Sequence, residues 1–136
     1  MLLEVKNLHK IYKNGTHALK GVSFKVKEGE FLVIIGLSGS GKSTLLRCIN
    51  RLIEPTTGKI IFNGKDVTHV RGEELRDLKR QIGMVFQQFN LIKRRSVLTN
   101  VITGKLGSLG TFESIFEKFS DDVYEKAHSC LETVGI

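Results

Sequence analysis

The 136-residue sequence contains one proline, two cysteines and no tryptophan. It also lacks a long apolar stretch: the longest unbroken run, Phe31–Ile35, is far shorter than the roughly 20 residues that a membrane-spanning helix needs. A transmembrane helix is therefore not expected in this sequence. The composition, 40% hydrophobic and 26% charged, excludes a disordered or collagen-like chain and predicts a folded domain with a hydrophobic core.

Cysteine and histidine show no pattern that predicts a metal site or a disulfide framework. Cys48 and Cys130 lie far apart without a second cysteine or a histidine at ligand spacing, so we expect free thiols in a reducing compartment. The sequence start, Met1–Lys6, reaches an acidic residue too early for a secretory signal. No role is predicted for the histidines, which are His9, His17, His69 and His128.

Glycine, in contrast, is abundant, with 14 residues or about 10% of the chain against an average of roughly 7%. An excess of glycine over proline indicates backbone that approaches another group closely. Three of the glycines concentrate in the segment Gly36–Ser43. This segment is the first candidate for a binding site.

The hydrophobic pattern predicts alternating strands and helices. The Phe31–Ile35 run is apolar on both faces, which is typical of a strand buried in a parallel sheet. Asn63-Gly64 predicts a tight turn after a strand. Strands are expected at 2–8, 18–26, 31–35, 60–62 and 82–86, and helices at 43–52, at 73–81, from about 96, and from a Ser120 cap to about 134.

The segment Gly36–Ser43 matches G-x-x-x-x-G-K-[ST], the pattern of a phosphate-binding loop, between the expected strand 31–35 and the expected helix 43–52. Glycines in such a loop allow successive backbone N–H groups to face an anion, and the helix N-terminus adds its positive dipole end. Lys42 supplies a positive charge for the β- and γ-phosphates, and the Ser43 hydroxyl is a ligand for Mg²⁺.

The flanking elements favour nucleotide binding over the alternative, a glycine-rich turn that binds nothing. The residues expected to hold the nucleotide are Gly36, Ser38, Gly39, Ser40, Gly41, Lys42, Ser43 and Thr44, joined by Tyr12 on the resemblance described next.

Over its whole length the sequence resembles the first half of an ABC-transporter ATP-binding subunit. Tyr12 stands upstream of the loop where that family places an aromatic residue that stacks on adenine. Gly83–Gln87 is similar to the end of a core strand followed by the Q-loop glutamine, which implies that Gln87 contacts Mg²⁺ and the attacking water. For the Q-loop glutamine, the alternatives are that Gln88 fills the role or that Gln87 is a plain surface residue. For Tyr12, the alternative is an ordinary aromatic residue at the end of a strand.

The resemblance implies an incomplete α/β fold of the P-loop NTPase class. It comprises a RecA-like core with an N-terminal antiparallel β-subdomain and the start of a helical subdomain. Residues 1–87 would form the β-subdomain and the P-loop core, and residues 88–136 the Q-loop and the beginning of the helical subdomain. Lys42 and Gln87 would be the catalytic residues, with ATP and Mg²⁺ as cofactors.

A closer resemblance, to phosphonate-importer ATPases, rests on the segments 87–91, 95–101, 104–107 and 131–136. It implies coupling of ATP hydrolysis to import of phosphonate or a related oxyanion. The implied partners are a second ATP-binding subunit, transmembrane permease subunits and, indirectly, a solute-binding protein. The implied location is the cytoplasmic face of the cell membrane, as a peripheral subunit.

Three parts of the family pattern do not occur in these 136 residues: the LSGGQ signature, the apolar strand ending in Asp-Glu, and the switch histidine. Leu37–Gly41 mimics the signature but belongs to the phosphate loop, and Asp121-Asp122 follows no apolar run. We therefore expect an N-terminal fragment that binds nucleotide but does not hydrolyse ATP alone. Without the later core strands of the family, Phe31–Ile35 would form an exposed apolar sheet edge that favours association.

Two other functions are considered. The net charge of +7 and the Lys93–Arg95 cluster are compatible with nucleic-acid binding, but the positive charges are scattered and no RNA-binding signature is present. No nucleic-acid partner is therefore expected. An ABC ATPase of another system, for export or for a non-transport process, is the second alternative, and the segments 87–91 and 96–107 argue against it by likeness.

Overall fold

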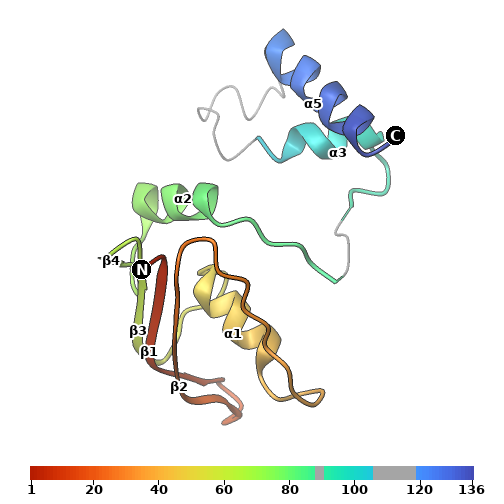
Figure 1. Cartoon of the computed structure of the whole chain (residues 1–136). Helices are drawn as coiled ribbons and strands as arrows, with labels where there is room; N and C mark the ends of the chain where they lie inside the picture. The colour runs from red at the N-terminus through yellow and green to blue at the C-terminus, as the bar shows by residue number, and fades with distance from the viewer. Residues whose placement is uncertain (88–90, 106–118) are drawn as a thin grey trace. The chain divides into compact units, whose positions relative to one another are not determined.

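The computed structural model describes residues 1–87, 91–105 and 119–136 (Figure 1). These residues form two compact units, Met1–Met84 and Val85–Ile136. Gln88, the alternative for the Q-loop role, lies outside the described residues.

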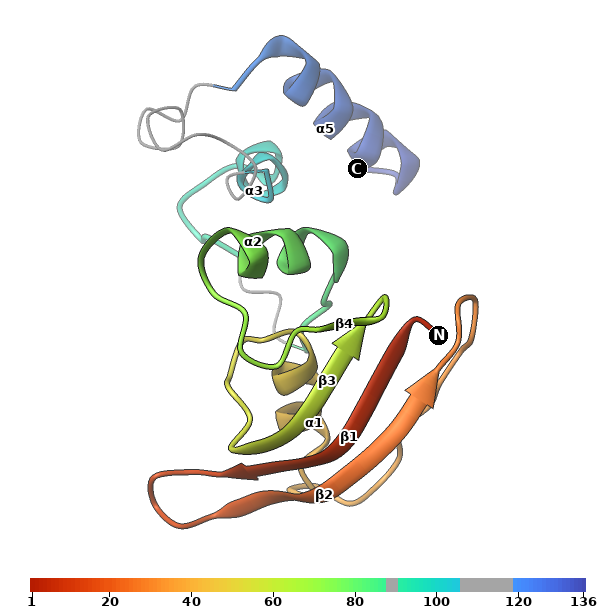
Figure 2. The ribbon, with the colours of Figure 1, turned by 90° about the vertical axis from the view of Figure 1, so that its left-hand side faces the viewer.

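The first unit is built on a four-stranded antiparallel sheet. Its strands are β1 (Leu3–Ile11), β2 (His17–Val26), β3 (Thr57–Phe62) and β4 (Lys65–Asp66), in the order β2-β1-β3-β4 (Figure 2). This sheet confirms the expected N-terminal antiparallel β-subdomain.

Two features of the backbone shape this sheet. Asn63 and Gly64 have φ angles of 49° and 78°, as the central residues of a type I′ hairpin turn require, and they connect β3 to β4. The β1–β2 ladder changes register three times, and Asn7 (φ 45°) and Gly21 (φ 83°) have left-handed backbone there. These irregularities place side chains of the hairpin in positions that strict alternation does not predict.

Helix α1 (Lys42–Ile49) lies against one face of the sheet, and helix α2 (Gly72–Gln81) follows β4 (Figures 1 and 2). The buried residues of these helices are Leu45, Cys48 and Ile49, which share one face of α1, and Leu78 of α2. They join one core with buried residues of the sheet and the segment after it, which are Val5, Leu8, Leu19, Ile60 and Val67.

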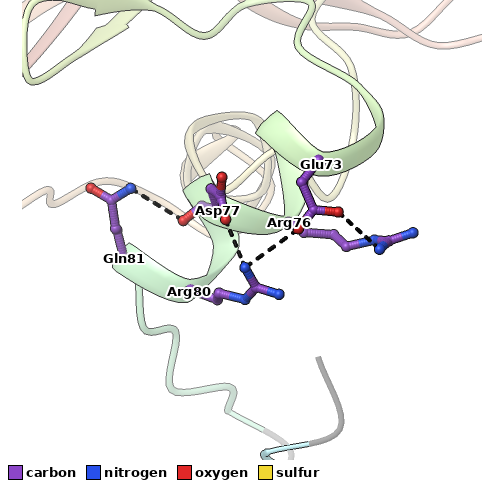
Figure 3. A network of polar contacts seen from close by, with 5 residues as sticks. All are labelled: Glu73, Arg76, Asp77, Arg80 and Gln81. Atoms are coloured by element: carbon purple, nitrogen blue, oxygen red, sulfur yellow. Dashed lines mark hydrogen bonds and ion pairs between the residues drawn. The ribbon is translucent and has the colours of Figure 1, made fainter. Parts of the chain in front are cut away.

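The outer surface of α2 carries a chain of charged side chains (Figure 3). Glu73 pairs with Arg76 at 3.0 Å and with Arg80 at 3.5 Å, and Arg80 also pairs with Asp77 at 2.7 Å. The Gln81 amide donates a hydrogen bond to the Asp77 carbonyl at 3.3 Å. Pairs at this spacing on an exposed helix contribute only about 0.2–0.5 kcal/mol each, so they support α2 without determining its position.

The described part of the second unit contains the helices α3 (Val97–Thr103) and α5 (Asp121–Thr133), which pack against each other. Each begins after a serine N-cap. The Ser96 hydroxyl accepts a hydrogen bond from the Thr99 N–H at 3.1 Å, whereas the Ser120 hydroxyl donates to the Asp122 carboxylate and caps no backbone group. The cap position at Ser120 is confirmed, but the bond that such a cap usually makes is replaced by this side-chain pair.

Two of the expected strands are wrong. Segments 31–35 and 82–86 have no regular secondary structure, and the side chains of Phe31 and Ile35 are 90% and 88% exposed. Every strand ladder of the described residues involves β1 to β4, and none extends to either segment. A strand without a neighbour leaves its backbone groups unpaired, so an apolar run alone does not form one. The side chains of Phe31–Ile35 are exposed, as predicted, but the segment is irregular and does not form the edge of a sheet.

No helix within the described ranges is both long and apolar enough to span a bilayer.

Candidate functional site

The loop between Gly36 and the start of α1 has the backbone conformation that its glycines permit. Gly39 and Gly41 have φ angles of 78° and 93°, a region that other residues rarely adopt. Gly41 is also the N-cap of α1 and packs so closely on β2 that an added Cβ would lie 2.5 Å from the Ala18 carbonyl oxygen. The glycine at 41 therefore serves both the turn and the close approach of the loop to the sheet.

The Lys42 side chain folds back over this loop. Its ammonium donates hydrogen bonds to the carbonyl oxygens of Gly36 and Leu37, each at 2.7 Å, and lies 3.4 Å from the Ser40 hydroxyl. An added Cβ at Gly36 would lie 2.9 Å from the same Ser40 oxygen, so the loop closes tightly on itself. The Lys42 ammonium is thus held by two backbone carbonyls and one serine hydroxyl of the loop.

The N-terminus of α1 adds further positive potential to the loop. The first turn contains no acidic residue, and no side chain caps its N–H groups. These free donors and the helix dipole favour an anion at this end of the helix. Ser38 and Ser43, two of the predicted ligands, are solvent-exposed here.

Tyr12 lies at the turn between β1 and β2 and reaches α1. Its hydroxyl oxygen is 3.2 Å from the Thr44 hydroxyl oxygen, one residue beyond the loop motif. The Lys10 ammonium lies 5.5 Å from the centre of the Tyr12 ring and donates a 2.6 Å hydrogen bond to the Glu54 carbonyl. The structure thus joins Tyr12 to the helix that the phosphate loop precedes.

A hollow lies between the loop and the start of β2. Its walls include Thr16, His17, Ala18, Leu19, Gly39 and Ser40. A second hollow surrounds Tyr12 itself, between Lys10 and Asn14. The loop and the aromatic residue thus each border open space that a ligand can enter.

Gln87, predicted as a catalytic residue and Mg²⁺ ligand, belongs to the second unit and follows an irregular segment in place of the expected strand. Its role remains a prediction. Sequence reasoning missed Lys10 and Ala18. Lys10 contacts Tyr12 two residues further along the chain, and Ala18 meets Gly41 because the loop packs on β2. The alternation of side chains along β1 could have indicated the first contact, but no local pattern indicates the second.

The donor set of the first unit suits a polyphosphate. It offers a lysine ammonium, uncapped helix N–H groups, glycine backbone without side chains and the exposed hydroxyls of Ser38 and Ser43, with no carboxylate in the first turn of α1. The predicted Mg²⁺ ligand Ser43 is at this same helix end, where a hydroxyl can share the cation with phosphate oxygens.

A glycine-rich loop that cups a lysine at the N-terminus of a helix, in an α/β fold, defines the P-loop NTPase class. The chain belongs to the ABC transporter family, whose profile matches residues 19–136. The predicted family and fold class are thereby confirmed.

The curated relatives include proteins named phosphonates import ATP-binding protein PhnC. The protein from Treponema denticola is 47% identical over 136 residues, which are 100% of this chain and 53% of the relative. The protein from Bdellovibrio bacteriovorus is 52% identical over 136 residues, which are 99% of this chain and 52% of the relative. The chain spans about half the length of the curated relatives it matches.

Solved structures of ATP-binding cassettes have the same fold. A dimeric cassette in a post-hydrolysis state with ADP and phosphate has a TM-score of 0.80 and 37% identity, covering 96% of this chain and 56% of that one. The cbiO1 protein of Clostridium perfringens, part of an ABC transporter complex, has a TM-score of 0.73 and 33% identity, covering 99% of this chain and 51% of that one.

Proposed function

We propose that this chain is the nucleotide-binding part of an ABC importer's ATP-binding subunit and that it binds ATP with Mg²⁺ at residues 36–44. The observation that carries the proposal is the Lys42 ammonium, held by the loop carbonyls of Gly36 and Leu37 at the N-terminus of α1. A cation held only by neutral oxygen atoms can exchange them for charged phosphate oxygens, which bind it more strongly.

Different residues of the chain would contact the phosphates, the Mg²⁺ ion and the adenine ring. Lys42 would leave the loop carbonyls to contact the β- and γ-phosphates, and the loop N–H groups would bind the remaining phosphate oxygens. Ser43 would hold Mg²⁺, which neutralises phosphate charge when bound. Tyr12 would stack on the adenine ring from its place at the β1–β2 turn.

The test is a titration of the 136-residue chain with ATP in the presence of Mg²⁺, with Lys42→Ala against Lys59→Ala. Lys59 is an exposed lysine of β3 and serves as the matched control. Loss of a hydrogen-bonded charge worth about 1.5–3 kcal/mol predicts an affinity about 10- to 150-fold lower for Lys42→Ala and no change for the control. Equal affinity of the two variants would contradict the proposal.

We further propose that the transported solute is a phosphonate or a related oxyanion. The proposal is supported by the names of two relatives, which are 47% and 52% identical to this chain over about half of their own length. The remaining partners would be a second ATP-binding subunit, transmembrane permease subunits and, through them, a solute-binding protein. The subunit would then lie peripherally at the cytoplasmic face of the membrane. Deleting the gene should abolish growth on a phosphonate as the only phosphorus source and leave growth on phosphate unchanged. Normal growth on both would reject this substrate.

Hydrolysis is proposed to require more than these 136 residues. The chain offers Lys42, Ser43 and the predicted Gln87, but none of its segments matches the Asp-Glu strand end that supplies a general base in the resembled family. We expect ATP binding without turnover by the isolated chain. Sustained phosphate release that depends on Mg²⁺ and disappears in Lys42→Ala would contradict this expectation.

A further inference from the structure

Two histidines of the β1–β2 hairpin meet across the strands. His9 Nδ1 lies 3.2 Å from His17 Nε2, and the two ring centres are 5.5 Å apart with the rings tilted by 31°. His9 belongs to β1 and His17 begins β2, so the two residues lie in different strands. The sequence spacing of these histidines therefore gives no sign of the contact.

Asn7 keeps the ring proton of neutral His9 on Nε2, so that Nδ1, the nitrogen facing His17, carries none. The Asn7 side-chain oxygen lies 3.2 Å from His9 Nε2 and accepts a hydrogen bond from it. A neutral imidazole with its proton on Nε2 has a bare lone pair on Nδ1. His9 Nδ1 thus faces His17 as an acceptor, which is the state in which histidine binds a metal ion.

The backbone makes room for this arrangement at Gly21. An added Cβ at this position would lie 2.9 Å from the Asn7 side-chain oxygen and 3.3 Å from His9 Nε2. Gly21 also has a φ of 83°, and Asn7 has a φ of 45°, so both residues use left-handed backbone where the ladder changes register. The irregular part of the hairpin therefore accommodates the Asn7–His9–His17 cluster.

We propose that His9 and His17 form a binding site for one divalent transition-metal ion, with Asn7 as the residue that orients His9. Zinc–nitrogen bonds of about 2.0–2.1 Å at a tetrahedral angle place two nitrogens about 3.3 Å apart, close to the separation seen here. His17 would carry its proton on Nδ1 in place of Nε2, and the two rings would turn so that both lone pairs converge on the ion. Both facing nitrogens then donate to the metal, and no proton leaves the site.

The ligand set selects the class of metal. Imidazole nitrogens favour Zn²⁺, Ni²⁺ and Cu²⁺ over Mg²⁺ and Ca²⁺, which prefer oxygen. Among the residues that the structure describes, no group of three or more histidine, cysteine or acidic side chains could hold a metal, so water completes the coordination. The site is therefore distinct in chemistry from a Mg²⁺–phosphate site at Ser43.

A bound ion would connect β1 to β2 on either side of the turn that carries Tyr12. His9 and His17 flank the segment 10–16, and His17 also lines the hollow beside Gly39 and Ser40. A cross-strand link of this kind stabilises the native hairpin, because the ion binds the folded chain and not the unfolded one.

The test is calorimetric titration of the tag-free 136-residue chain with Zn²⁺ and, separately, with Mg²⁺. We expect one Zn²⁺ per chain, no binding of Mg²⁺ in the absence of nucleotide, and an affinity at least about tenfold lower in His9→Gln and in His17→Gln. The matched controls are His69→Gln and His128→Gln, together with Cys130→Ser to remove the exposed thiol. These controls should bind Zn²⁺ as the unmutated chain does.

A second measurement needs no substitution. Nitrogen-15 spectra of the histidine rings should show Zn²⁺-dependent shifts at His9 Nδ1 and His17 Nε2, with the His9 Nε2 proton retained. The proposal would be overturned by any of three results: no Zn²⁺ binding at millimolar concentration, Zn²⁺ binding by His9→Gln and His17→Gln equal to that of the unmutated chain, or shifts confined to His69 and His128.

Discussion

The hydroxyl of Tyr12 and the hydroxyl of Thr44 lie 3.2 Å apart and join the β1–β2 turn to the first turn of α1. Thr44 follows Lys42 and Ser43 directly, so the contact holds the aromatic ring beside the helix that bears the phosphate loop. The proposed stacking of Tyr12 on adenine requires a fixed separation between its ring and the helix end that would bind the phosphates. The contact provides such a constraint.

Removal of the Tyr12 ring should therefore weaken nucleotide binding more than removal of its hydroxyl. Loss of stacking costs about 1–3 kcal/mol, which predicts an ATP affinity roughly 5- to 150-fold lower for Tyr12→Ala. Tyr12→Phe keeps the ring and should retain most of the affinity. Titration with ATP or ADP measures both, and wild-type affinity in Tyr12→Ala would show that the ring does not contact the base.

Gly41 and Gly39 provide a matched pair of substitutions in the loop. Both have positive φ, so alanine at either position costs roughly 1–2 kcal/mol of backbone strain. Only at Gly41 does the added Cβ also meet backbone, 2.5 Å from the Ala18 oxygen, whereas nothing lies within 4 Å at Gly39. Gly41→Ala should therefore lower the urea midpoint of the first unit clearly more than Gly39→Ala. Equal midpoints would show that the loop can move away from β2.

The predictable part of the site is the part that is local in sequence. Gly36–Ser43 was recognisable because a loop and a helix N-terminus are built from consecutive residues, and the structure has both. The Lys42 contacts with the loop carbonyls lie within six residues. The His9–His17 contact depends on the register of β1 with β2, and the Tyr12–Thr44 contact on the packing of α1 against the sheet, neither of which residue types alone determine.

The expected strands at 31–35 and 82–86 failed for a related reason. Apolar residues on both faces predict burial, but burial requires neighbouring strands, and the described part of the chain supplies none for these segments. By contrast, the strands that pair within the hairpins, β1 to β3, lie close to their predicted bounds. Local hydrophobic pattern therefore predicted β1, β2 and β3, which have partners, but not the two-residue strand β4 that pairs with β3.

The stability of the first unit should depend on pH through Asp66. Hydrogen bonds from the Thr68 hydroxyl and the Thr68 N–H lower the pKa of the Asp66 carboxyl below its ordinary value of 3.8. Because the folded pKa is the lower one, these bonds stabilise the fold above about pH 4, and the contribution disappears as the pH falls through the folded value.

Asp66→Asn should consequently lower the urea midpoint at pH 7 and have a smaller effect near pH 3. The effect is modest because the Asp66 side chain is largely exposed. Glu28→Gln, in an exposed turn, is the matched control and should change neither midpoint. A difference between Asp66→Asn and the unmutated chain that grows toward acid pH would contradict the assigned hydrogen bonds.

The two cysteines should differ strongly in reactivity. Cys130 is exposed, whereas Cys48 is fully buried in the core of the first unit, and this burial raises the pKa of the Cys48 thiol. Since the thiolate is the reactive form, one thiol per chain should react rapidly with a disulfide reagent at pH 8 and the second only on unfolding. Cys130→Ser should eliminate the rapid phase. Rapid reaction of that variant would show that the core opens.

Asn100 should hold the conformation of the segment 92–96, which contains the basic residues Lys93–Arg95 and precedes α3. Its side-chain oxygen accepts a 2.8 Å hydrogen bond from the Ile92 N–H, and its amide nitrogen donates to the carbonyls of Ser96 at 3.0 Å and Ile92 at 3.3 Å. Asn100→Ala removes all of these bonds at once, whereas Asn100→Asp keeps the acceptor and loses the donors. Hydrogen exchange at the Ile92 amide should therefore be fast in Asn100→Ala and remain slow in Asn100→Asp. Equal protection in both variants would mean that the segment 92–96 is held by its backbone alone.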